Sequence, residues 1–161
     1  MAKPTIHESI ERRNALRMAG LSQRFTPATT VEMGALWQRF VPLIGFDGRL
    51  GDGETYGVWV RRHPNDGSFD FFAGVPIAAA CTPPKPLEML TIPACTYLVY
   101  RQMLTEGELH PQTLVATDVI WSELAPASGR RVAAAPDFQV YPANFKVAEG
   151  WWIDHFLPLE D

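Results

Sequence analysis

Two stretches of aromatic and apolar residues, each closing with a proline, organise the hydrophobic pattern of the chain. Residues 69–77 read F-D-F-F-A-G-V-P-I, and residues 151–159, 82 positions later, read W-W-I-D-H-F-L-P-L. Side chains of these types fit a pleated, half-buried surface, and a proline at the end of a strand leaves no ladder hydrogen bond unmade. Each stretch therefore predicts a strand that ends in proline, and their likeness suggests a duplicated chain.

The residues before the first stretch predict a strand, a helix and a second strand. Residues 11–21 indicate the first strand, whereas the first ten residues are polar and are expected to be frayed. A helix is expected from Thr29, because Thr29 and Glu32 have the spacing of a capping box and apolar residues then recur on one face. These apolar residues are Met33, Leu36, Trp37 and Phe40. Pro42 marks the end of the helix.

A loop and a hairpin complete this first half. Residues 45–53 contain two Asp-Gly turn signals, and residues 56–61 (Y-G-V-W-V-R) have the composition of a strand. The N-D-G sequence at residues 65–67 predicts the turn that leads into the strand of residues 69–77.

The same order restarts after a short, proline-rich connector at residues 78–86. Residues 87–100 predict a long strand kinked at Pro93, and residues 112–124 predict a helix. F-Q-V-Y at residues 138–141 stands 82 positions after Y-G-V-W, and residues 151–159 close the repeat.

The repeated β-α-β-β order predicts the fold class. Each half, about 11–77 and about 87–159, would leave one sheet face and one helix stripe uncovered, and pairing two halves buries both. We therefore expect one α+β domain over residues 1–161, with pseudo-two-fold symmetry, antiparallel sheets curved around a central cleft, and two main helices. A cavity is expected at the seam between the halves.

Charge and cysteine content narrow the classes of partner and the location. The net charge of −4 argues against direct binding to nucleic acid or to an anionic membrane, since either needs a basic patch. Two cysteines do not make a disulfide framework, the start of the chain does not resemble a leader, and no run approaches the roughly 18 apolar residues of a membrane span. A cytoplasmic protein is the expectation, and a homodimer is left open.

Seven short motifs, in order, carry a family resemblance. They are L-W-x-x-F at 36–40, Y-G-V at 56–58, F-F-A-G at 71–74, I-P-A-C-x-Y-L-V-Y at 92–100, P-A-S-G at 126–129, P-D-F-Q-V-Y at 136–141, and a closing L-P at 157–158. Together they resemble the GyrI-like effector-binding domain, found at the end of some AraC-type and MerR-type bacterial regulators and as a free-standing protein. The resemblance implies a cleft that holds hydrophobic, often cationic, small molecules between aromatic side chains, with a buried carboxylate as counter-charge.

The chain departs from this family pattern at the counter-charge. The family motif usually reads P-x-F-E-x-Y, and here the glutamate position is Gln139, whose amide carries no charge to offset a desolvated cation. Asp118 on the second helix and Asp154 in the last strand are the two candidates to restore a charge. A solvent-facing carboxylate is the competing interpretation of each.

The candidate ligand-binding residues are mostly aromatic, because aromatic faces suit flat ligands and cations. They are Trp37, Tyr56, Phe72, Tyr97, Asp118, Trp121, Gln139, Tyr141, Trp152 and Asp154. Ordinary core packing is the competing interpretation of every aromatic member. Strand alternation places Gln139 and Tyr141 on one face, and it places Trp152 and Asp154 on the face opposite to His155.

Other chemistry receives less support from the sequence. The four histidines are scattered without zinc-ligand spacing, so neither a metal nor a cofactor is expected. The arginine pairs at 12–13, 61–62 and 130–131 are expected to be solvated.

Three functions therefore remain open. The first is a free-standing protein that binds a hydrophobic small molecule, neutral or cationic. The second is a hydrolase of strained, cyclopropanoid natural products, with Asp118 or Asp154 as the base. The third is a protein-protein inhibitor or adaptor of the gyrase-inhibitor type.

Overall fold

A computed structural model describes residues 3–161, and its strands form one eight-stranded antiparallel sheet in the order β1-β6-β8-β7-β3-β4-β2-β5. The strands are β1 (Ile6–Arg13), β2 (Leu16–Phe25), β3 (Thr55–His63), β4 (Ser68–Pro76), β5 (Glu88–Ile92), β6 (Cys95–Met103), β7 (Asp137–Tyr141) and β8 (Trp152–Pro158). Strands β2, β4 and β3 of one half mirror β6, β8 and β7 of the other. The α+β fold with a duplicated strand order is therefore as the sequence predicts.

Two main helices connect the strands of each half. Helix α1 (Met33–Phe40) follows a 3-10 turn, η1 (Thr30–Glu32), and continues into a second one, η2 (Val41–Leu43), that contains the predicted terminating proline. Helix α2 (Leu109–Val119) continues through a π-helical segment, η3 (Ile120–Leu124), into α3 (Ala125–Ala127). The second helix thus begins three residues before the predicted residue 112.

The first predicted strand is wrong, because residues 11–21 are divided between two strands. Residues up to Arg13 belong to β1, which starts at Ile6 and pairs with β6, so the expectation of a frayed start is also wrong from residue 6 onward. Residues from Leu16 belong to β2, which pairs with β4 and β5. The long strand of residues 87–100 is likewise divided at Pro93 into β5 and β6. Each half therefore lends its leading strand to the other half.

This exchange curves the sheet. Strand β1 lies at one edge and β2 lies next to the other edge, yet only Asn14 and Ala15 separate them. Three peptide steps reach at most roughly 11 Å, so the two edges must approach each other there. A single apolar cluster, which includes Met18, Tyr97 and Phe156, fills the concave face that results.

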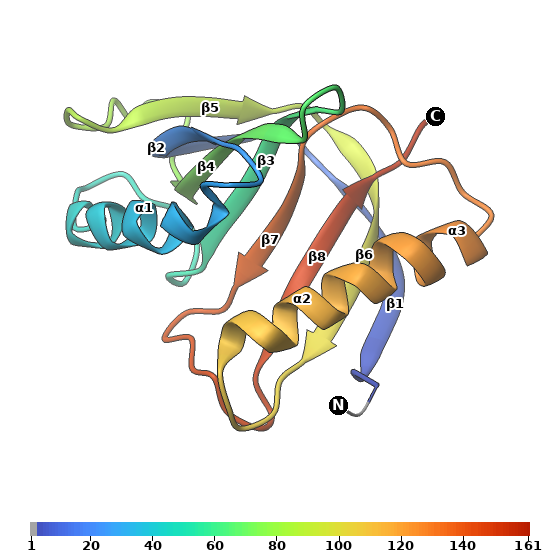
Figure 1. The fold of residues 1–161 in the computed structure, drawn as a ribbon. Helices are drawn as coiled ribbons and strands as arrows, with labels where there is room; N and C mark the ends of the chain where they lie inside the picture. Colours follow the sequence, from blue (N-terminus) through green and yellow to red (C-terminus); the bar gives the residue numbers. More distant parts are fainter. Residues whose placement is uncertain (1–2) are drawn as a thin grey trace.

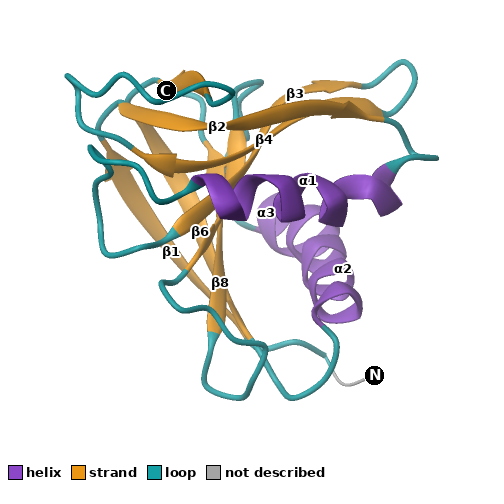
Figure 2. Cartoon of the chain, turned by 90° about the vertical axis from the view of Figure 1, so that its left-hand side faces the viewer, coloured by secondary structure: helices purple, strands orange, loops and turns teal. Residues whose placement is uncertain are grey.

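The helices cover the other face, which we call the helix face. Leu36 and Phe40 of α1 pack with Phe71 of β4, and Ile120 of η3 packs with Leu98 of β6. Figure 1 and Figure 2 show α1 against β2, β4 and β3, and α2 against β6 and β8. The two clusters on this face are separate, and β3 and β7 run between them.

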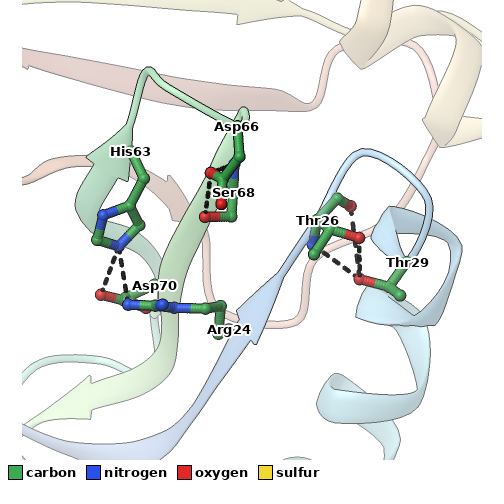
Figure 3. Close-up of polar contacts among 7 residues, drawn as sticks. All are labelled: Arg24, Thr26, Thr29, His63, Asp66, Ser68 and Asp70. Carbon is green, nitrogen blue, oxygen red and sulfur yellow. Dashed lines mark hydrogen bonds and ion pairs between the residues drawn. The ribbon is translucent and has the colours of Figure 1, made fainter.

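Local polar contacts confirm one turn prediction and correct one cap. At the β3–β4 hairpin, Asp66 accepts hydrogen bonds from the backbone and the hydroxyl of Ser68, at 2.9 and 2.7 Å (Figure 3). The capping box at Thr29 is wrong: its Oγ1 accepts from the amide of Thr26, at 2.8 Å, and caps no helix. That hydroxyl stabilises the turn before the helix.

Candidate functional site

A small cavity lies where the two halves meet on the helix face. Its volume is about 220 Å³, and its lining residues come from both helices, both central strands and one loop. They are Trp37 of α1, Thr55 of β3, Leu109 of α2, Tyr141 of β7 and Phe145 of the loop before β8. We call this the cleft. The seam between halves therefore carries the kind of cavity that the duplicated pattern predicts.

Aromatic rings form the walls of the cleft. The rings of Trp37 and Tyr141 meet edge to face, with centroids 5.7 Å apart, and those of Tyr141 and Phe145 do so at 5.3 Å. Edge-to-face contacts of this kind fix ring orientation as well as bury area. The walls therefore present fixed apolar surfaces to a ligand.

Behind Tyr141, the helix face of β7 and β8, which we call the floor, carries polar, uncharged side chains. The hydroxyl of Tyr141 donates a hydrogen bond to Oε1 of Gln139 at 2.8 Å, so the two side chains share one face as strand alternation predicts. Gln139 is buried, and burial raises the pKa of Tyr141, which keeps the phenol protonated at neutral pH. Next to the cleft, the floor therefore offers hydrogen bonds and no compensating charge.

A buried histidine extends this polar floor beneath α2. His155 lies opposite Gln139 in the β7–β8 register, and its Nε2 lies 2.9 Å from Oε1 of Gln102. Burial lowers the pKa of His155 to about 4, so the imidazole is neutral at pH 7 and Nε2 donates the proton to the amide oxygen. Gln102 also borders a larger hollow of about 640 Å³, formed with the first turns of α2 and residues 3–5. That hollow has no aromatic wall and no lining residue from α1, β3 or β7, so the smaller cleft is the better candidate.

An ion pair between Asp137 and Arg62 lies at the other end of the same floor, near the start of β7. Asp137 precedes Gln139 by two residues on the same face of β7, and it accepts hydrogen bonds from Nε and Nη2 of Arg62, at 3.1 and 2.8 Å. The guanidinium carbon lies 5.4 Å from the ring centroid of Trp59 and 5.2 Å from that of Trp121. Burial raises the pKa of Asp137, and the positive charge of Arg62 opposes that rise. Arg62 is exposed, as expected of the 61–62 pair, and it also forms an ion pair that the sequence did not predict.

Four of the predicted ligand-binding residues lie on the helix face of the sheet. Trp37 and Tyr141 line the cleft, Gln139 accepts the hydrogen bond of Tyr141, and Trp121 lies against Arg62. They come from α1, η3 and β7.

Five predicted residues lie on the opposite, concave face and do not line the cleft. Phe72 and Tyr97 are buried in the cluster that fills that face, and the hydroxyl of Tyr56 accepts a hydrogen bond from Nη1 of Arg13 at 3.0 Å. Trp152 and Asp154 both contact Arg101 there. Strand alternation is the physical reason, since their positions are out of phase with those of Gln139 and His155.

The two predicted carboxylates are therefore not in the cleft. Asp154 makes a two-bond ion pair with Arg101 at 2.8 and 2.9 Å on the opposite face, and Asp118 is exposed on α2. Neither can act there as counter-charge or as catalytic base. The hydrolase hypothesis in the form predicted from the sequence has no base in this cleft.

Several site residues escaped the sequence analysis. Asp137 could have been found, because it shares its strand face with Gln139. Arg62 could not, because a β-bulge between Trp59 and Arg61 changes its face. Phe145 lies in an irregular loop that gave no signal. Within residues 3–161, no three His, Cys, Asp or Glu side chains gather as metal ligands.

The chain matches one protein family over most of its length. The model of that family, Cass2, described as integron-associated effector binding protein, matches residues 9–159. Fold and match together define an effector-binding protein of the GyrI-like type. The chain belongs to the Cass2 family of integron-associated effector-binding proteins. A comparison with curated proteins finds no match.

Solved structures share the fold. SAV2435 bound to tetraphenylphosphonium aligns with a TM-score of 0.74 and 13% identity, covering 96% of this chain and 94% of that one. The integron cassette protein VCH_CASS2 of Vibrio cholerae aligns with a TM-score of 0.69 and 18% identity, covering 95% of each chain. The C-terminal domain of EcmrR aligns with a TM-score of 0.62 and 11% identity, covering 97% and 98%. No helix among the described residues is long and apolar enough to cross a membrane.

Proposed function

We propose that this protein binds a hydrophobic small molecule in the cleft between α1 and α2. The observation that carries the proposal is the aromatic cavity at the junction of the two halves, with Trp37, Tyr141 and Phe145 as walls. Membership of an effector-binding family supports it, as does the structural neighbour described in complex with tetraphenylphosphonium. Stacking on the rings supplies affinity, and Gln139 with the Tyr141 hydroxyl fixes orientation.

The size of the cleft restricts the ligand. About 220 Å³ lies below the roughly 300–1,000 Å³ of drug-sized ligand pockets. We therefore propose a compound with two or three fused or linked rings. A larger ligand requires the loop that carries Phe145 to move outward.

The experiment is a titration with N-phenyl-1-naphthylamine, an uncharged probe that fluoresces in apolar surroundings. We expect saturable binding that weakens at least about tenfold in Trp37→Leu, since buried aromatic anchors dominate binding energy. Trp152→Leu is the matched control, because Trp152 lies on the opposite face and contacts Arg101. Absence of saturable binding by this probe and by a panel of similarly sized aromatic compounds would overturn the proposal.

The proposal also covers nucleic-acid binding, cellular location and oligomeric state. The net charge of −4 supports a chain that makes no direct contact with nucleic acid, and a cytoplasmic location agrees with two unpaired cysteines. A homodimer is the simplest assembly for a chain of this size. Light scattering at several protein concentrations tests the dimer, and a constant monomer mass would exclude it.

A further inference from the structure

The surroundings of Arg62 have the composition of a binding site for an organic cation. The carboxylate of Asp137 accepts two hydrogen bonds from the guanidinium, at 3.1 and 2.8 Å. Two indole rings, of Trp59 and Trp121, lie 5.4 and 5.2 Å from the guanidinium carbon. Carboxylates and tryptophan faces are the groups with which proteins hold flat or quaternary cations. Here the chain itself supplies the cation.

A β-bulge in β3 turns the side chain of Arg62 toward Asp137 and Trp59. Trp59 pairs with Phe71, whereas Arg61 pairs with Asp70, so Val60 is an extra residue in β3. As a result, Trp59 and Arg62 both point to the helix face, although regular alternation would have placed Arg61 there. Trp59 also lies directly opposite Asp137 in the β3–β7 register. The local irregularity therefore brings Arg62 to Trp59 and Asp137.

The guanidinium of Arg62 neutralises the negative charge of the buried Asp137 carboxylate. The side chain of Asp137 is 11% exposed, whereas that of Arg62 is 48% exposed. Arg62 is the charged group that lowers the pKa of Asp137 against the effect of burial. Removing the partner of a buried carboxylate leaves an uncompensated charge, which is strongly destabilising. Without Arg62, the carboxylate of Asp137 would therefore favour another cation. The more exposed partner is the one that can be replaced from solution.

We propose that Asp137, Trp59 and Trp121 form a cation-binding site that Arg62 keeps filled, so that this end of β7 takes no cation from solution. The inference rests on the proposed function, since both concern the helix face of β7. Asp137 and Tyr141 lie four residues apart on this strand, or roughly 13 Å. Between them lies Gln139, and beside it lies the neutral His155. With Arg62 in place, this floor has no free charge for a cationic ligand.

The opposite face supplies a matched control. Arg101 makes a two-bond pair with Asp154, at 2.8 and 2.9 Å, and its guanidinium carbon lies 4.8 Å from the ring centroid of Trp152. This pair resembles the Arg62 pair in its chemistry, and Arg101 is similarly exposed, at 47%. It has one indole instead of two. Removing Arg101 therefore tests whether any carboxylate freed from an arginine would bind a cation equally well.

The experiment compares two ligands of equal shape and different charge. Phenylguanidinium reproduces the head group of Arg62, and phenylurea is its uncharged isostere. By calorimetry, we expect Arg62→Ala to bind phenylguanidinium at least about tenfold more tightly than the wild type does, with phenylurea unchanged. The gain should vanish in Arg62→Ala/Asp137→Asn, and Arg101→Ala should gain less than threefold. Equal affinity of wild type and Arg62→Ala for phenylguanidinium overturns the inference, and so does an equal gain in Arg101→Ala.

Stability provides a second measurement. Arg62→Gln keeps a hydrogen-bond donor near Asp137, and it replaces Arg62→Ala should the latter fail to fold. We expect phenylguanidinium to raise the Tm of the arginine-free variant and not that of the wild type, because binding to the native state stabilises by mass action. No rise in Tm in a folded variant overturns the inference. Failure of N-phenyl-1-naphthylamine to bind the wild type would instead overturn the proposed function, so the two failures are distinguishable.

Discussion

Gly57 and Gln139 lie directly opposite each other in the register of β3 and β7, and they are equivalent positions of the repeat, 82 residues apart. The pseudo-two-fold axis therefore passes between them. A Cβ on Gly57 would lie 2.9 Å from Cζ of Phe71 and 3.3 Å from Cζ2 of Trp37. At the axis, Gly57 of the first half has no side chain, and this lets Trp37 approach the sheet. The second half has the amide side chain of Gln139 at the equivalent position. The cleft is asymmetric although the strand order is symmetric.

The first prediction concerns this glycine. Gly57→Ala should lower the free energy of unfolding by about 1–3 kcal/mol, because the added methyl forces Phe71 and Trp37 apart in a packed region. It should also weaken binding of N-phenyl-1-naphthylamine, since Trp37 is a wall of the cleft. Urea unfolding and fluorescence titration measure the two effects.

Gly34→Ala is the control for that substitution. Gly34 lies in α1, and a Cβ there would meet no atom within 4 Å. Alanine should stabilise the exposed helix by roughly 0.5–1 kcal/mol through helix propensity. Equal effects of the two substitutions would contradict the close contact at Gly57.

The sequence predicts those parts of the fold that depend on local pattern. Alternation in residues 138–141 places Gln139 and Tyr141 on one face, and helical spacing places Leu36 and Phe40 against the sheet. The hydrophobic pattern of a strand does not show, however, which distant strand pairs with it. The pairing of β1 with β6 is decided by the curvature of the whole sheet, so residues 11–21 looked like one strand.

The candidate site is less predictable for the same reason. Aromatic residues suit both a core and a binding cleft, and Tyr97 and Tyr141 differ only in the face to which their strands turn them. The pairing of Arg62 with Asp137 requires the bulge at Val60, which no residue type announces. The sequence thus locates the seam, and packing decides which side chains reach it.

The second prediction concerns the amide at the axis. Gln139→Glu should lower the free energy of unfolding at pH 7 by about 1–3 kcal/mol, because the position is buried and its neighbours Tyr141 and His155 carry no positive charge. It should also strengthen binding of N-benzylquinolinium, a three-ring cation within the size limit of the cleft, at least about tenfold relative to the wild type, since a desolvated carboxylate favours a cation.

Calorimetry with N-benzylquinolinium checks this, and N-phenyl-1-naphthylamine, which is similar in size, serves as the uncharged control ligand. Its affinity should change less than threefold. A similar gain for both ligands would mean that the substitution opens the cleft without supplying a charge, and this would contradict the electrostatic argument.

The last prediction is a pH dependence that originates in His155. Its pKa is lowered from 6.5 to about 4 by burial, so the unfolded chain binds a proton between these values and the native protein does not. Stability should therefore be unaffected by this group above about pH 6.5 and should fall as the pH decreases toward 4, by about 3 kcal/mol in total.

The difference in free energy of unfolding between wild type and His155→Gln, measured in urea at pH 7.5 and at pH 4.5, isolates this contribution because other titrating groups cancel. We expect the variant to lose less stability than the wild type over this interval, whereas His7→Gln, a change at an exposed position of β1, should follow the wild type. Parallel pH profiles of wild type and His155→Gln would mean that the imidazole is hydrated in the native state, and the neutral Nε2–H donor to Gln102 would then have to be abandoned.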